Sequence, residues 1–421
     1  MRITGRRVTV LGAGQTGLAA AHFLSAQGAQ VYLSERAALA PEAAHDLEAW
    51  GVEYEQDGHS ERALAQAELI VPSPGIPISA PILRAARRRG IPIIGELELG
   101  YLACPSRRII AVTGSVGKTT TVSLIEHLLR ANGHQVVRAG NEAQPFVAAL
   151  PQIGPETIVL LEVSSFQLET VEKFRSQVSV FTCFAPNHLD RHGTLAAYLA
   201  LKCRLFHCQT EGDWAIVQRQ IELPSGLQAR LVRFDGSELN GLEQRELLPH
   251  QCANLAAAWL ACRALDPEIQ LARLELNKAL ALPHRIQFVA QVAGIDFYDD
   301  SKATCSAATQ AALQGFSSSL VLIVGGRSKG EDLSQLVQAI RERDLKSVLL
   351  MGEAAPQFAR ALSAAGYRRF HYVDNLSEAV RLALELKPQS CLLSPACASF
   401  DQFSNYRERG RVFQGIVRAV A

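Results

Sequence analysis

The sequence lacks the features that mark several large classes of protein. Charge of neither sign is in excess, since 42 basic residues face 41 acidic ones and the net charge is +1. We therefore expect neither a nucleic-acid partner nor a membrane partner. No apolar run reaches the roughly 18 residues that a membrane-spanning helix needs. The N-terminus leads directly into an expected strand, so we expect no signal peptide. We find no internal repeat and no low-complexity segment.

The nine cysteines form no pattern typical of a metal site or a disulfide framework. They are scattered, with no CxxC pair and no Cys/His spacing suited to zinc. Reduced thiols fit a reducing compartment, so we expect a cytoplasmic protein. A chain of 421 residues with 48% hydrophobic content is long enough for two or three domains.

Strand-like and helix-like segments alternate along almost the whole chain, which predicts parallel sheets covered by helices. The pattern separates into three blocks. A hairpin that turns at Ala293-Gly294 is expected to open the third block, and helices over 250–265 and 268–281 are expected to close the second. We place the domains at residues 1–97, 98–282 and 283–421.

Residues 107–121 (RRIIAVTGSVGKTTT) carry the most informative motif. A short apolar strand leads into a glycine turn, and a helix starts at Lys118. Backbone N–H groups at a helix N-terminus bind phosphates, while the lysine reaches the β- and γ-phosphates and the Thr119 hydroxyl is placed to ligate Mg²⁺. The motif departs from the usual pattern at Val112, where a glycine is expected. The predicted ATP-binding residues of this loop are Gly114, Ser115, Gly117, Lys118, Thr119 and Thr120.

Residues 12–17 (GAGQTG) match G-x-G-x-x-G between a strand expected over 7–11 and a helix, and a second strand is expected over 30–34. With Glu35 at the end of the next strand, this is the dinucleotide fingerprint, in which the carboxylate binds a ribose hydroxyl. Such a motif binds a diphosphate at a helix N-terminus, and NAD is one of several nucleotides that contain a diphosphate. A tight turn without a ligand is the alternative. Ser73 and Gly75 follow the next expected strand and would face the same crevice.

Two further polar residues follow strands of the second block. Glu162 ends an apolar strand, where a carboxylate can hold Mg²⁺ beside a phosphate-loop hydroxyl; a capping or salt-bridged glutamate is the alternative. His188 can contact metal or phosphate. Asp190 and His192 can equally cap a helix that begins near Thr194.

Two helical residues of the second block are ambiguous from spacing alone. Lys202 lies in YLALKCRLF, where a solvated lysine is the more frequent case. Asn254 lies in HQCANLAAAWL, where an ordinary polar helix position is the more frequent case.

The third block gathers cations at its strand ends. Lys302 and Lys329 each follow a strand, and Arg285 opens the block, so an anionic ligand is expected there. The last helix is opened by SPACASFDQFSNYRERG, in which Ser399, Asp401 and Ser404 can be caps or substrate ligands.

Taken together, these motifs resemble the Mur ligases of bacterial cell-wall synthesis. The resemblance covers essentially the whole chain, and the segments occur in the family's order. The C-terminal segment SPACASFDQF is most similar to the branch that adds D-glutamate to UDP-N-acetylmuramoyl-L-alanine. The matching segments are GAGQTGL, SPGI, TGSVGKTTT, GN (140–141), EVSSFQLE, NHLDRHG, the helix with Lys202, HQCAN, LPHR, DDSKAT, VGGRSKG and SPACASFDQF.

The resemblance implies three α/β domains and one reaction. The N-terminal domain is expected to be Rossmann-like and to bind a UDP-sugar in place of NAD. The central domain is expected to be a P-loop ATPase with a mainly parallel sheet, and the C-terminal domain Rossmann-like. The implied reaction is ATP-dependent amide formation through an acyl phosphate, with ATP and Mg²⁺ as cofactors and a monomer as the expected state.

The resemblance also implies a role for each matching residue. The implied catalytic residues are Lys118, His188 and Lys202. The implied metal ligands are Thr119, Glu162, His188 and, if carbamylated, Lys202. Further ATP contacts are Asn254, Arg285 and Asp300. The implied UDP-sugar contacts are Gly14, Gln15, Thr16, Glu35, Arg36, Ser73, Gly75 and Asn141. The implied amino-acid contacts are Lys302, Thr304, Lys329, Ser399 and Phe400.

Four loop positions depart from the family's usual residues: Val116, residues 142–144, Asn187 and Cys305. The residues with the most direct implied roles are intact, so we expect an active enzyme. Three alternatives remain open: a Mur-type amide ligase for another amino acid, an NAD-dependent oxidoreductase that uses GAGQTG, and a non-catalytic nucleotide-binding protein.

Overall fold

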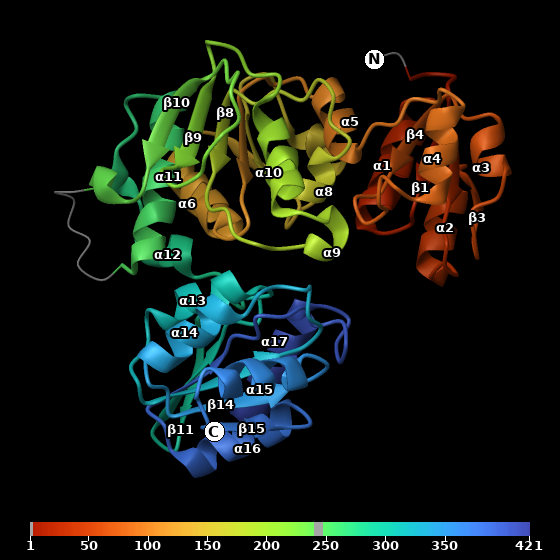
Figure 1. Cartoon of the computed structure of the whole chain (residues 1–421). Coiled ribbons are helices and arrows are strands. Elements are labelled where there is room, and N and C mark those ends of the chain that lie inside the picture. Colours follow the sequence, from red (N-terminus) through yellow and green to blue (C-terminus); the bar gives the residue numbers. More distant parts are fainter. Residues whose placement is uncertain (1–2, 240–246) are drawn as a thin grey trace. The chain divides into compact units, whose positions relative to one another are not determined.

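The computed structural model describes residues 3–239 and 247–421. The described residues form three sheets with helices between the strands, which confirms the expected three-domain α/β fold (Figure 1). They divide into two compact units. The first unit contains the N-terminal and central sheets. The second contains the C-terminal sheet and also the segment Phe184–Leu195.

The N-terminal sheet has four parallel strands in the order β3-β2-β1-β4. Since β1 lies between β2 and β4, its C-terminal end is the switch point where ligands bind in such sheets. The expected strands 7–11 and 30–34 are confirmed. The strands are β1 (Arg7–Leu11), β2 (Gln30–Ser34), β3 (Glu53–Glu55) and β4 (Leu69–Pro72), and the helices are α1 (Gln15–Ala26), α2 (Pro41–Ala49), α3 (Arg62–Ala65) and α4 (Pro81–Arg88).

The central sheet has six parallel strands in the order β10-β9-β8-β5-β7-β6. All five residues of β5 are buried, so the strand that precedes the phosphate loop is fixed from both faces. The strands are β5 (Ile109–Thr113), β6 (Val136–Gly140), β7 (Ile158–Glu162), β8 (Val178–Phe181), β9 (Trp214–Gln218) and β10 (Arg230–Phe234). The helices of this part of the chain are α5 (Glu96–Ala103), α6 (Lys118–Ala131), α7 (Phe146–Ala149), α8 (Ser165–Leu168), α9 (Leu189–His192), α10 (Leu195–Cys203), α11 (Pro249–Leu265) and α12 (Leu276–Leu280).

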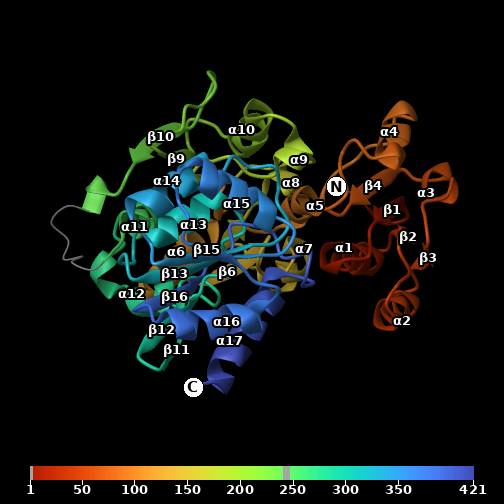
Figure 2. The same cartoon turned by 60° about the horizontal axis from the view of Figure 1, so that its bottom comes forward.

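The C-terminal sheet has the order β11-β12-β16-β13-β14-β15 and is parallel except for β11. The hairpin of β11 and β12 turns at Ala293 and Gly294, as predicted. Helices α13–α15 cover one face and α16 and α17 the other, each over its own apolar cluster (Figure 2). The strands are β11 (Gln287–Val292), β12 (Ile295–Asp299), β13 (Leu320–Gly325), β14 (Ser347–Met351), β15 (Phe370–Tyr372) and β16 (Ser390–Leu393), and the helices are α13 (Ser306–Leu313), α14 (Ser334–Glu342), α15 (Ala355–Ala364), α16 (Leu376–Leu386) and α17 (Tyr406–Ala419).

Two expected helix features are wrong. The helix expected over 268–281 is broken into a 3₁₀ turn at Leu271–Arg273 and the short α12, because Leu274 takes an extended backbone between them. The last helix begins at Tyr406, and Asn405 caps it by accepting the backbone N–H of Glu408. None of the three residues proposed as caps from the sequence therefore occupies the N-cap position.

Among the described residues, no helix is both long and apolar enough to cross a bilayer. All nine cysteines are free thiols.

Candidate functional site

The phosphate loop follows β5 and ends at the first residue of α6. Gly114 and Gly117 have φ angles of +153° and +89°, which side chains rarely adopt. A Cβ at Gly114 would lie 2.1 Å from Thr182 Oγ1, and a Cβ at Gly117 would lie 2.6 Å from Asn254 Oδ1. The loop therefore needs glycine at both positions, while Val112 lies inside β5, where a side chain is buried without strain.

Two lysines meet at the carbonyl oxygen of Gly114. Lys118 Nζ and Lys202 Nζ each donate to it at 2.9 Å. Lys202 is only 1% exposed, so the frequent case of a solvated helical lysine does not apply here. Burial, and next the Lys118 charge, hold the pKa of Lys202 well below its usual range. Lys118 is therefore the cation at this carbonyl, and burial favours the neutral amine of Lys202.

The carboxylate of Glu162 lies at the C-terminal end of β7 and is 1% exposed. Its Oε1 accepts a hydrogen bond from Asn141 Nδ2 at 3.2 Å. Its Oε2 is buried and has no hydrogen-bond partner among the described residues. A buried carboxylate oxygen without a partner is costly, so a cation fits there.

A divalent metal at the unpaired oxygen of Glu162 would need further oxygen ligands. Within residues 3–239 and 247–421 no group of three His, Cys, Asp or Glu side chains can hold a metal ion. The hydroxyl of Thr119 at the start of α6, the unpaired oxygen of Glu162 and phosphate oxygens would be hard ligands of the kind that Mg²⁺ prefers.

Asn254 is buried behind the phosphate loop. It is 8% exposed, and Thr121 Oγ1 donates to its Oδ1 at 3.4 Å. Asn254 is therefore a buried polar residue of its helix, in contact with the first turns of α6. The expected helix itself, residues 250–265, is confirmed by α11.

The glycine turn after β1 is held by Glu35. Its two carboxylate oxygens accept the backbone N–H groups of Ala13 at 2.6 Å and Ala37 at 3.0 Å. Partial burial raises the pKa of Glu35, but the N–H groups of Ala37, Ala13 and Arg36 together bring it below its usual value. A Cβ at Gly17 would lie 1.9 Å from the carbonyl oxygen of Gly12, so helix and turn touch through backbone atoms.

Most of the other predicted nucleotide-sugar residues lie in or near the same turn, and Asn141 directly follows β6. Ser73 Oγ donates to the carbonyl oxygen of Gly12 at 3.4 Å, so the segment after β4 meets the turn after β1. Gly14 is the N-cap residue of α1 and offers no side-chain cap. Gln15, Arg36 and Gly75 are exposed and Thr16 is half-buried.

Lys329 and Thr304 come together in the second unit. Lys329 Nζ donates to Asn187 Oδ1 at 3.3 Å and to Thr304 Oγ1 at 3.4 Å. Burial of the ammonium lowers the pKa of Lys329. Ser399 is buried and Phe400 is 62% exposed. A cation held by two neutral oxygens is suited to bind a carboxylate.

Arg285 precedes β11 and Asp300 follows β12. Because these two strands are antiparallel, both residues lie at the same edge of the C-terminal sheet. Burial raises the pKa of Asp300 to about 7, although the Ser394 hydroxyl and the Arg285 charge act in the other direction. Ser394 Oγ donates to Asp300 Oδ2 at 2.7 Å. Arg285 Nε is buried without a partner among the described residues. Lys302 Nζ lies 5.2 Å from the centre of the Tyr406 ring.

His188 is the N-cap of α9, with a left-handed backbone (φ +55°) and no side-chain cap bond. Asp190 and His192 lie inside α9, which ends before α10 begins at Leu195. Neither residue is therefore the N-cap of the helix that was expected near Thr194.

Sequence reasoning missed two residues that organise these sites. Thr182 Oγ1 donates to the carbonyl oxygen of Val116 at 2.6 Å and so braces the phosphate loop from β8; no local motif marks it. Glu331 is 6% exposed and accepts from both the backbone N–H and the hydroxyl of Ser306. A carboxylate two residues after the strand-end Lys329 was the available signal.

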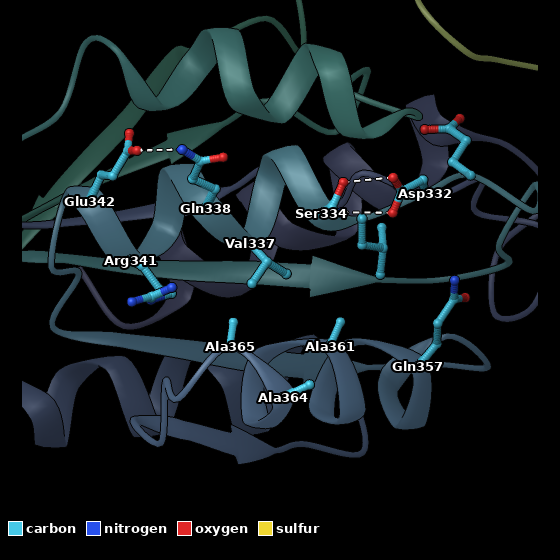
Figure 3. A pocket seen from close by; sticks show the side chains of 12 residues that line it. Asp332, Ser334, Val337, Gln338, Arg341, Glu342, Gln357, Ala361, Ala364 and Ala365 are labelled. Carbon is cyan, nitrogen blue, oxygen red and sulfur yellow. Dashed lines mark hydrogen bonds between the residues drawn. The ribbon is translucent and has the colours of Figure 1, made fainter.

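A groove of about 740 Å³ lies between α14 and α15 (Figure 3). Its floor is apolar, with Val337 facing Ala361 and Ala365, and Asp332 lies at one end. None of the residues predicted from the sequence to bind a ligand lines it.

Family models match the chain in three consecutive segments. The Mur ligase MurD-like N-terminal domain matches residues 6–95, the Mur ligase middle domain matches residues 112–235, and the Mur ligase glutamate ligase domain matches residues 284–397. The first and third segments contain the whole of the N-terminal and C-terminal sheets, and the middle segment contains the central sheet from Val112 in β5 onward.

Curated proteins are similar over the full length. A UDP-N-acetylmuramoylalanine–D-glutamate ligase of Koribacter versatilis is 37% identical, covering 100% of this chain and 99% of that protein. The protein of the same name from Pelotomaculum thermopropionicum is also 37% identical, covering 98% of each.

Solved structures share the fold. A UDP-N-acetylmuramate–alanine ligase of Thermotoga maritima has a TM-score of 0.60 and 18% identity, covering 99% of this chain and 100% of that one. A second ligase from Thermotoga maritima, solved with ADP, has a TM-score of 0.60 and 16% identity, covering 100% and 99%.

Proposed function

This chain belongs to the Mur ligase family, and we propose that it joins D-glutamate to UDP-N-acetylmuramoyl-L-alanine while converting ATP to ADP and phosphate. The observation that carries the proposal is the pair of lysine side chains on the Gly114 carbonyl, the charged Lys118 and the buried Lys202, near a buried carboxylate oxygen of Glu162 without a hydrogen-bond partner. That arrangement suits a triphosphate and a cation. The similarity to curated D-glutamate ligases over 98–100% of the chain supports the substrates.

The reaction has two steps. In the first, a carboxylate oxygen of the L-alanyl group attacks the γ-phosphorus of ATP; the bond from that phosphorus to the β-phosphate bridging oxygen breaks, and ADP leaves. In the second, the D-glutamate amine attacks the acyl carbon, loses a proton, and phosphate leaves. The first step brings two anions together, so nearby cations must offset their repulsion. Lys118 is the cation that this loop supplies.

Mg²⁺ would be held by Thr119 and Glu162 and, at a second position, by His188 and Lys202. When bound, it would neutralise phosphate charge and polarise the γ-phosphoryl group. A lysine is a metal ligand only after it loses its positive charge. Burial favours the neutral amine of Lys202, which can add to CO₂, forming an N–C bond and releasing a proton, to give a carbamate.

The remaining ligands divide among the three sheets. The UDP part of the substrate would lie against Gly14, Gln15, Thr16, Glu35, Arg36, Ser73 and Gly75, with Asn141 near the sugar. Ser115, Thr120, Asn254, Arg285 and Asp300 would contact ATP. The two carboxylates of D-glutamate would be bound by Lys302, Thr304, Lys329, Ser399 and Phe400, of which Lys329 and Thr304 are already joined by a hydrogen bond.

The proposal keeps the domains at residues 1–97, 98–282 and 283–421. We also propose that the protein is a monomer and that it lies in the cytoplasm. The nine free thiols support only the second of these, because they fit a reducing compartment. Limited proteolysis tests the boundaries, and light scattering tests the oligomeric state.

The test of the function is an ADP-release assay with UDP-N-acetylmuramoyl-L-alanine and ATP. We expect release with D-glutamate and little with L-glutamate, other amino acids or no amino acid. Release with a different amino acid instead would assign another Mur-type ligase. Binding of NADH, followed by fluorescence, would support the oxidoreductase alternative.

A further inference from the structure

Two three-residue segments, 304–306 and 329–331, are joined by hydrogen bonds at both ends. At one end, Lys329 Nζ donates to Thr304 Oγ1 at 3.4 Å. At the other, Glu331 Oε2 accepts from Ser306 N at 2.8 Å and from Ser306 Oγ at 2.5 Å. Because each segment spans only three residues, fixing one fixes the other. Glu331 thereby anchors the first turn of α13 to the loop that carries Lys329.

Glu331 also brings a negative charge close to the Lys329 ammonium. The side chain is 6% exposed, and its Oε1 is buried with no hydrogen-bond partner among the described residues. The ammonium of Lys329 is itself directed to two neutral oxygens, on Asn187 and Thr304. The two opposite charges therefore attract one another without a direct hydrogen bond between them.

We propose that Glu331 is a positioning residue for Lys329, keeping its ammonium charged and aligned to bind a carboxylate of the amino-acid substrate. This inference rests on the proposed function. A carboxylate bonded directly to Lys329 would compete with the substrate. Glu331 avoids that competition, because its bonded oxygen is taken by Ser306.

The groups around Lys329 determine the direction in which its pKa should change when Glu331 is replaced. Burial lowers the pKa of Lys329, while Cys305, Glu331, Asp190 and Cys397 act to raise it. Removing the Glu331 charge should therefore lower the pKa further, so that the protonated form is lost at a lower pH. The affinity for a carboxylate should fall with it.

The first experiment compares Glu331→Gln with Asp332→Asn. The control residue is the next carboxylate on the same loop; it is exposed and accepts from Ser334 N at 2.9 Å and Ser334 Oγ at 2.6 Å (Figure 3). For Glu331→Gln we expect KM for D-glutamate to rise about tenfold, the change that one pKa unit represents. The alkaline limb of kcat/KM for D-glutamate should move to lower pH, while kcat and KM for ATP change less than about twofold. Asp332→Asn should change none of these.

The second experiment needs no turnover. The pKa of Lys329 is measured by NMR on full-length protein with ¹³Cε-labelled lysine, the signal being assigned by its loss in Lys329→Arg. We expect a lower pKa in Glu331→Gln and an unchanged one in Asp332→Asn. Glu331→Asp, which keeps the charge, should titrate like the wild type.

The outcomes separate this inference from the proposed function. An unchanged Lys329 titration in Glu331→Gln, or an equal rise of KM for all three substrates, overturns the positioning role. A wild-type protein without D-glutamate-dependent turnover overturns the proposed function, and the NMR titration still decides whether Glu331 acts on Lys329.

Discussion

At the scale of single residues, the carbonyl oxygen of Gly114 is the centre of the proposed ATP site. It accepts from Lys118 and Lys202, and no acidic side chain takes part in that contact. Lys118 is the cation placed there to meet a phosphate, while burial favours the neutral amine of Lys202. Because the two lysines come from α6 and α10, which are far apart in the sequence, the loop and α10 must fold together to make the site.

The first prediction concerns Lys118. Lys118→Ala should lower kcat of ADP release by about 10²–10³-fold, because it removes a donor aimed at charge that develops during phosphoryl transfer. Steady-state kinetics measure this, with Lys173→Ala as the matched control, since Lys173 is exposed. An active Lys118→Ala variant would contradict the assignment of this loop.

The second prediction concerns Glu162. Glu162→Gln should raise the Mg²⁺ concentration for half-maximal activity by at least about tenfold, because the unpaired buried oxygen is the one placed to meet a cation. A Mg²⁺ titration of activity measures this. Glu156→Gln is the control, because that side chain is 91% exposed. An unchanged Mg²⁺ requirement would show that Glu162 is only a structural partner of Asn141.

The residue types of the site could be predicted from the sequence, but not their surroundings. The glycine turn and Lys118 are adjacent in the chain, so a local motif reveals them. Lys202 and Asn254 are buried by packing against the distant phosphate loop, and helical spacing alone favours an exposed position for both. Thr182 follows β8 without any motif, and only the adjacency of β5 and β8 brings it to Val116.

At the scale of elements, the first helix shows how closely backbone atoms meet. Gly17 in α1 leaves no room for a side chain, since a Cβ there would lie 1.9 Å from the carbonyl oxygen of Gly12. The turn after β1 and α1 are therefore one rigid piece, and its glycines serve packing as well as ligand approach.

The third prediction follows from that contact. Gly17→Ala should raise KM for the nucleotide-sugar substrate at least about tenfold or lower the melting temperature by several degrees, because the clash is with backbone. Kinetics and thermal unfolding measure the two effects. Gly415→Ala in α17 is the control, since a Cβ there meets nothing within 4 Å; it should be neutral or stabilising. Equal behaviour of the two variants would contradict the packing argument.

Helix α5 contains a buried carboxylate that makes stability depend on pH. Glu96 is 2% exposed; its Oε1 accepts from Val147 N at 2.8 Å, and its Oε2 has no partner among the described residues. Burial raises the pKa of Glu96 from 4.5 to about 7. Between those values the unfolded chain loses this proton while the folded protein keeps it, so this group's contribution to stability falls as pH rises.

The fourth prediction uses that window. Glu96→Gln should become more stable relative to the wild type as pH rises from 4.5 to 7, by at most about 3 kcal/mol, and the difference should be constant above it. Chemical denaturation at several pH values measures this. Glu156→Gln, at a side chain that is 91% exposed, should show no such trend. A difference that is constant across the window would show that Glu96 titrates normally.

Elements defined by local pattern could be predicted closely, and those defined by long-range packing could not. Strands β1 and β2 begin and end at the expected residues, because short apolar runs are bounded by glycine or polar residues. The prediction of one helix over 268–281 was wrong because only Ile269 and Ala279 of that segment are buried. The segment therefore has no continuous face that packs against a partner. The predicted caps of α17 were wrong because several residues upstream of the helix have side chains that can cap it.

At the scale of the whole molecule, the proposed ligands are divided between two compact units. Lys118, Glu162 and Lys202 belong to the first, and Lys302 and Lys329 to the second. An acyl phosphate must be shielded from water until the amine arrives. The proposed function therefore draws on residues of both units.

The fifth prediction is a change of solution shape on nucleotide binding. Small-angle scattering should give a smaller radius of gyration with a non-hydrolysable ATP analogue, Mg²⁺ and nucleotide-sugar than without ligands. Lys118→Ala, which should bind the analogue weakly, is the control and should show a smaller change. Identical profiles with and without ligands would argue against closure.

The most direct test of the central claim is phosphate release from ATP in the presence of UDP-N-acetylmuramoyl-L-alanine. The account predicts rapid release with D-glutamate, and slow release with L-glutamate or without an amino acid. Release that needs no amino acid, or that is equally fast with both enantiomers, would contradict it.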